Sequence, residues 1–281
     1  MNVAVIGLGL IGGSIAKAAK QNTEHRILGM DINESVRLKA KLIEAIDEVC
    51  TADDLPNCDM LILALHPRAA EEWLQQSAAS LKEGALVVDC CGTKRRICQI
   101  GFALAEKYHF QFIGGHPMAG IERSGFEASS GKLFSKASMI LTPGQHCDIR
   151  QLEFAKRFFL SLGFARITLS TPEEHDRIIA YTSQLAHVVS SSYMKSTTAF
   201  SHAGFSAGSF RDMTRVAQLH EGMWTELFLE NREFLAQEIE DLIKQLQRYR
   251  DAITNQQEDD LRALLKEGRE LKHKIDELSN K

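Results

Sequence analysis

The stretch Asn2-Val-Ala-Val-Ile6, followed directly by Gly7-Leu8-Gly9-Leu10-Ile11-Gly12, opens the chain and decides the fold. An apolar strand that runs into a glycine-rich turn and then into a helix is the pattern of a dinucleotide-binding turn. Gly7 permits the tight turn, Gly9 lets the backbone approach a pyrophosphate, and Gly12 lets the helix pack close to the sheet. The amides and dipole at the helix start then face the phosphates. We therefore predict that residues 7–12 bind a dinucleotide cofactor.

A carboxylate follows the second apolar run, Arg26-Ile-Leu-Gly-Met30. Asp31 stands about 20 residues beyond the last glycine of the turn, where a carboxylate meets the adenosine ribose hydroxyls. Asp31 would repel a 2′-phosphate, and the first cation downstream of it is Arg37. The sequence therefore favours NAD over NADP.

Composition limits the class of protein. A chain of 281 residues is long for one core, so we expect an α/β domain and a smaller second domain. The net charge of -4 gives no support to nucleic-acid binding, and no apolar run approaches the roughly 20 residues of a membrane helix. The apolar N-terminus lacks a basic region, which favours a cytoplasmic protein over a secreted one. The six cysteines include no C-x-x-C pair, so we expect no metal site and no disulfide framework.

Apolar runs alternate with helical patterns up to residue 170. Residues 60–65 and 85–89 are typical of strands buried on both faces, and polar helical stretches cover residues 69–81 and 96–108. Further strands are expected at 110–113, 138–142 and 164–168, with a helix at 148–162. This pattern predicts an N-terminal Rossmann-like, doubly wound sheet over residues 1–170.

Helical spacing dominates from Thr171 onward, which predicts an all-α domain over residues 171–281. Long helices are expected at 174–198, 223–250 and 258–278. So few helices bury little surface alone, which favours a dimer interface formed by this domain. The alternative is that the apolar stripe closes the chain's own core; the stripe consists of Leu227, Phe234, Ile239, Leu242 and Leu246.

In open α/β sheets, ligands lie beyond the carboxyl ends of the strands. His66, the segment Asp89 to Lys94 and the segment Gly114 to Gly120 follow apolar runs and so fall at that edge. His116 is the most unusual of these, because glycines on both sides would let backbone and ligand come close. A histidine there can accept a hydroxyl proton near neutral pH, as alcohol oxidation by NAD requires. We take His116 as a candidate base, with a structural histidine as the alternative; His66 either lines the cofactor or forms a turn.

A second group of polar residues lies in the helical half. Arg211 and Arg215 are four residues apart, hence on one helix face, and Asp212 lies beside them. The planar fork of arginine suits a carboxylate, so this face could bind an anionic substrate. A solvated helix face with a local ion pair is the alternative.

Several motifs occur together in a characteristic order: Gly7 to Ser14, Gly114-Gly-His-Pro-Met-Ala-Gly120, His175-Asp176, Ser183-Gln-Leu-Ala-His187 and Phe210-Arg-Asp-Met-Thr-Arg215. In this order the chain resembles the prephenate dehydrogenase (TyrA) family, which includes arogenate dehydrogenases, over nearly its whole length. The resemblance implies oxidative decarboxylation of prephenate to 4-hydroxyphenylpyruvate, with hydride transfer to NAD, in tyrosine biosynthesis. Arogenate dehydrogenase, which would produce tyrosine directly, is the alternative within the family.

The resemblance also implies roles for individual residues. His116 would bond the C4 hydroxyl of the substrate and accept its proton, and Arg215 would bind the ring carboxylate. The remaining implied residues form or gate the entrance, or line the pocket: Glu122, Arg211 and Asp212 for the entrance, and His187 and Trp224 for the pocket. The family dimerises through its helical domain, so a homodimer is expected, with Trp224 potentially supplied by the partner.

Two segments depart from the common family pattern. Asp89-Cys-Cys-Gly-Thr-Lys94 has Gly92 where many members carry a serine, and Thr93 is the candidate substitute for its hydroxyl. Ser183-Gln-Leu-Ala-His187 lacks one histidine and a helix-bending proline but keeps His187. There are two competing interpretations: another β-hydroxyacid or imine oxidoreductase with the same two-part architecture, such as a pyrroline carboxylate reductase, and an NAD-sensing or dimeric interaction protein without catalysis. The segment Gly114 to Gly120 and the paired arginines argue against the first, and His116 with Arg215 against the second.

Overall fold

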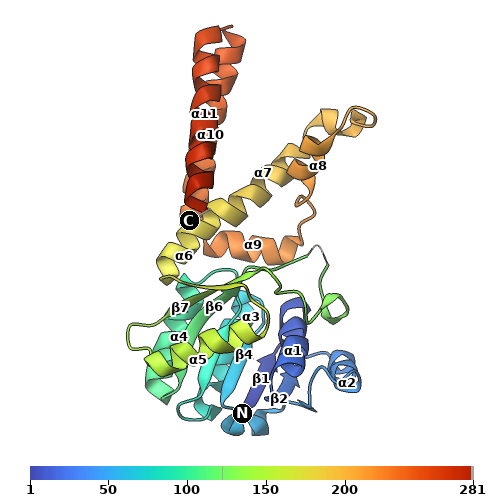
Figure 1. The fold of residues 1–281 in the computed structure, drawn as a ribbon, viewed down its shortest axis with the longest axis vertical. Coiled ribbons are helices and arrows are strands. Elements are labelled where there is room, and N and C mark those ends of the chain that lie inside the picture. Colours follow the sequence, from blue (N-terminus) through green and yellow to red (C-terminus); the bar gives the residue numbers. More distant parts are fainter. Residues whose placement is uncertain (122, 280–281) are drawn as a thin grey trace. The chain divides into compact units, whose positions relative to one another are not determined.

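The computed structural model describes residues 1–121 and 123–279 (Figure 1). The chain divides into two compact units, Met1–Arg232 and Glu233–Lys281. The sequence predicted a boundary near Ser170, where the secondary structure changes from the last strand to helices. The prediction of domains at 1–170 and 171–281 remains an expectation, since the compact units divide the chain elsewhere.

The first unit contains an 8-stranded sheet, counted over the described residues, in the order β3-β2-β1-β4-β5-β6-β7-β8. The strands are β1 (Asn2–Ile6), β2 (Arg26–Met30), β3 (Glu48–Val49), β4 (Met60–Leu63), β5 (Leu86–Asp89), β6 (Gln111–Pro117), β7 (Ser138–Pro143) and β8 (Arg166–Leu169). The sequence predicted all of these except the two-residue β3. Strands β1 to β6 run parallel to one another, whereas β7 runs antiparallel to β6 and β8 runs parallel to β7, so the last two strands point the opposite way. The chain between β6 and β7 holds the short 3-10 helix η3 (Phe126–Ala128) in place of a crossover helix.

Helices cover both faces of the sheet, as a doubly wound fold requires. The helices are α1 (Leu10–Asn22), α2 (Glu34–Leu42), α3 (Pro67–Ser77), α4 (Arg95–Tyr108) and α5 (Ile149–Ser161), with 3-10 turns η1 (Ala52–Asn57) and η2 (Ala78–Ser80). Alternating residues of β1 point to opposite faces, so Val5 joins a core with α1 and α5, while Ile6 joins a core with α3 and α4. The N-terminal Rossmann-like sheet is therefore confirmed.

The helices after β8 pack on the same unit. They are α6 (Pro172–Ile179), the π-helical η4 (Ala180–Leu185), α7 (Ala186–Tyr193), the 3-10 turn η5 (Thr197–Ser201), α8 (Gly208–Thr214) and α9 (Glu221–Glu230). The single helix expected at 174–198 is thus interrupted by a π-helical segment and ends at Tyr193. The helix expected at 223–250 is broken at Asn231, which is fully buried and whose amide donates to the carbonyl of Asp176 and to Gln184.

The second unit is a helical hairpin of α10 (Arg232–Thr254) and α11 (Glu258–Ser279). Arg248 pairs with Glu267 at 3.0 Å, and the hydroxyl of Tyr249 donates to the carbonyl of Leu264. Several apolar side chains of the hairpin stay exposed: Ile243, Leu246, Ile253, Leu265, Leu271, Ile275 and Leu278. Among the described residues, no helix is long and apolar enough to cross a membrane.

Candidate active site

Each glycine of the first turn occupies a different environment. Gly7 has a φ of +88°, and a Cβ on it would lie 2.5 Å from the carbonyl oxygen of Ala64. A Cβ on Gly12 would lie 1.8 Å from the carbonyl oxygen of Gly7. A Cβ on Gly9 would meet no described heavy atom within 4 Å beyond its chain neighbours. The fold therefore requires Gly7 and Gly12, whereas Gly9 borders open space beside the first turn of α1, as a pyrophosphate site needs.

Asp31 directly follows β2, next to this turn. Its Oδ2 accepts a hydrogen bond from the backbone N–H of Leu8 at 2.8 Å, and its Oδ1 accepts one from Asn33. Each carboxylate oxygen has a second lone pair for a ribose hydroxyl. Asp31 therefore also braces the glycine turn, which its sequence position alone does not reveal. His66 is the exposed N-cap residue of α3 at the end of β4, the strand beside β1, so it lies at the same sheet edge.

Two histidines and an aspartate form a chain of hydrogen bonds at the end of β6. Nδ1 of His116 lies 2.9 Å from Nε2 of His175, and Nδ1 of His175 lies 2.7 Å from Oδ1 of Asp176. His175 and Asp176 are buried in α6, whereas His116 is partly exposed. We call these three residues the histidine relay. Sequence reasoning gave His175 no role of its own; the His175-Asp176 pair within the family motif was the available signal.

The carboxylate of Asp176 caps the N-terminus of α4. Its Oδ1 accepts from the backbone N–H of Lys94 at 2.7 Å, and its Oδ2 accepts from that of Arg95 at 2.9 Å. Burial alone would raise the pKa of Asp176, but the hydrogen bonds from His175 and from the backbone amides hold this pKa below its usual value. Asp176 is therefore ionised at neutral pH.

A buried ion pair supports the strand that carries His116. The ammonium of Lys94 binds Asp89, and both side chains are fully buried. Burial would lower the pKa of Lys94, but Asp89, together with Cys91 and Cys98, raises it. Oδ1 of Asp89 also accepts from the N–H of Gly115 at 3.0 Å. This pair fixes the backbone next to His116 and leaves a positive charge nearby.

The glycines before His116 serve sheet packing, which corrects the expectation that they admit a ligand. A Cβ on Gly114 would lie 2.1 Å from Oγ1 of Thr142, and one on Gly115 would lie 2.4 Å from the carbonyl oxygen of Asp89. Protein atoms thus fill the space that a side chain or a ligand atom would occupy at these two glycines. The close approach of a ligand to His116 must come from another side.

The surroundings of the relay favour neutral imidazoles. Burial, followed by His175 and Lys94, lowers the pKa of His116 well below its usual value. Burial also lowers the pKa of His175, against the opposing effect of Asp176. A histidine that is neutral near pH 7 can accept a proton, so the geometry suits His116 as a general base.

The residues implied as a substrate clamp lie together in the helical part. The rings of His187 and Trp224 have centroids 3.9 Å apart, and Nδ1 of His187 lies 3.2 Å from the carbonyl oxygen of Val216. Burial and then the charge of Arg215 lower the pKa of His187. Trp224 and His187 meet within one chain, so this contact needs no second copy. Exposed Arg211 and Asp212 lie on α8; Glu122 lies outside the described residues.

One continuous stretch, from α6 through η4 to α7, carries both His175 and His187. They are twelve residues apart, which in an unbroken α-helix of 3.6 residues per turn would place them about a third of a turn apart. The π-helical η4 rotates less per residue, because its hydrogen bonds span five residues. It therefore turns His187 back toward the face that carries His175.

Helix α9 lies beside the end of the sheet (Figure 1), and it contacts the segment that follows β5. A Cβ on Gly92 would lie 3.0 Å from Cδ2 of Leu227, so α9 covers this glycine. Thr93 is buried, and its hydroxyl donates to the carboxylate of Glu230. Burial raises the pKa of Glu230, against the opposing hydrogen bond from Thr93. With its hydroxyl engaged by Glu230, Thr93 is poorly placed to replace the family serine, and geometry argues against the catalytic role expected for it.

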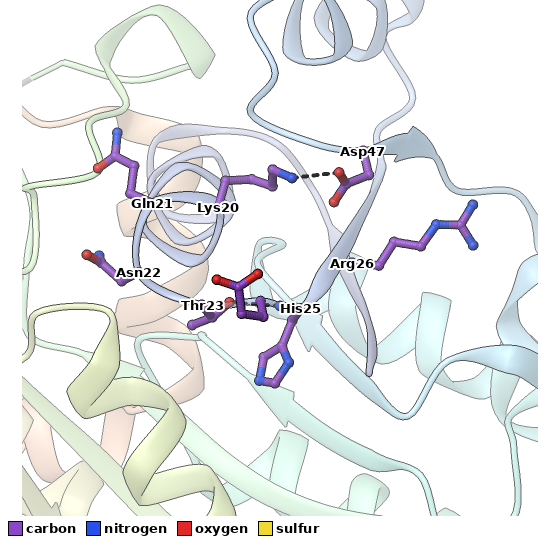
Figure 2. Close-up of a pocket in the computed structure, with 8 residues that line it drawn as sticks. Lys20, Gln21, Asn22, Thr23, His25, Arg26 and Asp47 are labelled. Carbon is purple, nitrogen blue, oxygen red and sulfur yellow. Dashed lines mark hydrogen bonds and ion pairs between the residues drawn. The ribbon is translucent and has the colours of Figure 1, made fainter.

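A separate open pocket of about 490 Å³ lies at the end of α1 and the start of β2 (Figure 2). Lys20 and Asp47 form an ion pair of 2.6 Å at this pocket, and His25 and Arg26 also line it. Because β2 starts at Arg26 and ends at Met30 before Asp31, this pocket lies at the amino-end edge of the sheet. It holds none of the residues predicted to bind cofactor or substrate.

Comparison with known proteins gives matches over most of the chain. The family model described as "Prephenate dehydrogenase, nucleotide-binding domain" matches residues 15–169, and "Prephenate dehydrogenase, dimerization domain" matches residues 171–267. The prephenate dehydrogenase of Bacillus subtilis is 30% identical over 268 residues, which is 92% of this chain and 72% of that protein.

Solved structures agree with these matches. The crystal structure of prephenate dehydrogenase from A. aeolicus, in complex with hydroxyphenyl propionate and NAD+, has a TM-score of 0.85 and 30% identity, and covers 98% of each chain. The arogenate dehydrogenase of Synechocystis has a TM-score of 0.83 and 27% identity, covering 98% of this chain and 100% of that one. With both family models matched in order along it, the chain belongs to the prephenate dehydrogenase family of oxidoreductases.

Proposed function

We propose that this chain catalyses the oxidative decarboxylation of prephenate to 4-hydroxyphenylpyruvate with NAD, a step of tyrosine biosynthesis. The observation that carries the proposal is His116, a partly exposed and neutral histidine held by His175 at the carboxyl end of β6. Family membership supports the reaction, and the similar A. aeolicus structure supports NAD as the cofactor.

Residues 7–12 would hold the pyrophosphate, Asp31 the adenosine ribose, and His66 would flank the cofactor from the start of α3. Bound NAD supplies the acceptor for the hydride that leaves C4 of prephenate. Nε2 of His116 accepts the proton of the C4 hydroxyl as that hydride leaves. When the ring carboxylate departs as carbon dioxide and the ring becomes aromatic, His116 returns this proton to the phenolic oxygen.

Arg215, His187 and Trp224 bind and orient the substrate in this proposal. Arg215 pairs with the ring carboxylate, so that carbon dioxide leaves from a fixed position. His187 and Trp224 line the pocket. Arg211 and Asp212, on α8, form the entrance.

A homodimer through the helical domain is part of the proposal. The family model for residues 171–267 is described as a dimerization domain, and the hairpin of α10 and α11 leaves apolar side chains such as Leu246 and Ile275 exposed. Burying such a stripe against a second copy removes apolar surface from water.

We also propose a cytoplasmic location.

Initial rates with two substrates and two cofactors test the function directly. We expect the highest kcat/KM for prephenate with NAD, because Asp31 disfavours a 2′-phosphate and the prephenate dehydrogenases are similar over most of the chain. A higher kcat/KM for arogenate would favour the alternative, in which tyrosine is formed directly. Absence of turnover with both substrates would overturn the proposal.

The substitution Gly9→Ala tests the cofactor site without disturbing the fold. A Cβ on Gly9 meets open space, and its φ of -71° suits alanine. We expect the melting temperature to stay unchanged and the KM for NAD to rise at least about tenfold, because the methyl group occupies the pyrophosphate position. The matched Gly12→Ala should instead lower the melting temperature, since its Cβ would clash with Gly7. Unchanged NAD kinetics in folded Gly9→Ala would contradict the assignment.

A further inference from the structure

We propose that His175 and Asp176 are positioning residues, which fix the tautomer and ring orientation of His116 so that its Nε2 is the unprotonated atom facing the substrate. The inference rests on the proposed function for the identity of the substrate. The tautomer itself is a property of the protein and can be measured without substrate.

The hydrogen bonds allow one arrangement of protons. Asp176 is ionised and accepts, so Nδ1 of His175 carries the proton that it donates at 2.7 Å. Neutral His175 then has a lone pair on Nε2, which accepts from Nδ1–H of His116 at 2.9 Å. Neutral His116 therefore keeps its own lone pair on Nε2. The carboxylate of Asp176 thus determines which nitrogen of His116 can act as the base.

The backbone determines where that carboxylate lies. Both oxygens of Asp176 accept from amides at the start of α4, and Asn231 donates to its carbonyl. The positive end of the α4 dipole favours the negative charge. Because the two donors to the carboxylate are backbone amides at a helix terminus, the carboxylate cannot rotate without losing these hydrogen bonds. The relay therefore extends from a rigid helix terminus to His116.

The charges around the relay act on the proton that His116 accepts. Nε of Arg95 lies 3.5 Å from Oδ2 of Asp176, and Lys94 is paired with Asp89 at the end of β5. Lys94 disfavours an imidazolium at His116, whereas Asp176 stabilises positive charge in the relay through His175. His116 thus stays neutral before reaction, and the positive charge that it gains when Nε2 accepts the proton is stabilised through the hydrogen bond from its Nδ1 to His175.

The substitution Asp176→Asn tests this arrangement. Asparagine replaces one acceptor oxygen of Asp176 by a donor. With its nitrogen toward His175 it donates to Nδ1 of that ring, which moves the proton of His175 to Nε2 and places the proton of His116 on Nε2, while its oxygen keeps the hydrogen bond from Arg95. We expect kcat to fall about 10²- to 10⁴-fold, while the KM values for prephenate and NAD change less than about threefold. The amide keeps only one of the two hydrogen bonds that cap α4, so the melting temperature is expected to fall in either case. A merely structural role would change the KM values together with kcat.

The direct readout is the ¹⁵N chemical shifts of the imidazole nitrogens in uniformly ¹⁵N-histidine-labelled protein without ligands. We expect His116 to show protonated Nδ1 and unprotonated Nε2 in the parent, and the reverse in Asp176→Asn. Asp148→Asn is the matched control, because Asp148 also caps a helix, α5, through a hydrogen bond from Arg150. This control should keep the parent's kcat and the parent's shifts.

Two substitutions of His175, the middle residue of the histidine relay, provide a second test. In His175→Gln the amide oxygen can still accept from His116, whereas His175→Phe leaves both His116 and Asp176 without this partner. We expect His175→Gln to retain at least about tenfold more kcat than His175→Phe, with thermal melts confirming that each variant is folded.

The results of these experiments distinguish failure of the histidine relay from failure of the proposed function. A parent with Nε2 of His116 protonated, or a folded His175→Phe variant that keeps the parent's kcat, would overturn the relay. A parent with the expected tautomer but no turnover of prephenate or arogenate would overturn the proposed function and leave the relay intact.

Discussion

His116→Asn is expected to lower kcat about 10³-fold, with the KM values for prephenate and NAD changed by less than about threefold. Asparagine is similar in size and can still donate a hydrogen bond to His175, but it cannot take up the proton of the C4 hydroxyl. Steady-state kinetics with both substrates varied give the kcat and KM values separately. The exposed His146 offers a matched control, because His146→Asn should leave kcat unchanged. A kcat within threefold of the parent in His116→Asn would rule out His116 as the base.

The pH dependence of kcat/KM also distinguishes His116→Asn from the parent protein. Activity requires neutral His116, whose pKa is lowered by burial, by His175 and by Lys94. The kcat/KM of the parent should therefore stay constant as pH falls through the usual histidine value of 6.5, and decline below it as His116 becomes protonated. The decline caused by His116 should be missing in His116→Asn. A parent profile that falls already between pH 8 and 7 would contradict a neutral His116 in this range.

Arg215→Ala is expected to raise the KM for prephenate about 100-fold, with a smaller change in kcat. The guanidinium is proposed to bind the ring carboxylate, and a charge-assisted pair of this kind is the strongest class of hydrogen bond in such a site. Arg215→Lys should fall between alanine and the parent, since it keeps the charge but loses the planar fork. The exposed Arg157, on α5, provides the control Arg157→Ala.

Kinetics of the two variants together distinguish the base from the clamp. Loss of kcat in Arg215→Ala, with loss of affinity in His116→Asn, would show that the two roles are reversed. An unchanged KM for prephenate in folded Arg215→Ala would remove Arg215 from the binding site.

The parts of the fold that the sequence predicted are those encoded by local patterns. Buried strands such as β1 and β4 read as continuous apolar runs, and the glycine turn follows β1 directly. The antiparallel direction of β7 is set by its pairing with β6, which no local pattern encodes. The break between α9 and α10 likewise depends on Asn231, whose partners Asp176 and Gln184 are far away in the sequence.

The candidate site likewise combines features that the sequence predicts with features that depend on distant contacts. The placement of Asp31 beside the glycine turn and of His116 at the end of its strand follows from strand order. The relay could not be read from the sequence, because His116 and His175 are 59 residues apart. Thr93 was chosen for its nearness to Gly92 along the chain, but its hydroxyl binds Glu230, which is 137 residues away. The grouping of His187 with Trp224 was expected from the family resemblance, and the ring contact shows that grouping within one chain.

The central claim is that His116 and Arg215 act on one substrate molecule beside the cofactor. The most direct test is a crystal structure of the parent protein with prephenate and NADH, a complex that cannot turn over because its cofactor is already reduced. We predict Nε2 of His116 within about 3.2 Å of the C4 hydroxyl oxygen, and the guanidinium of Arg215 on the ring carboxylate of the same molecule. Prephenate bound with C4 directed away from the nicotinamide, or His116 and Arg215 facing separate cavities, would contradict the account.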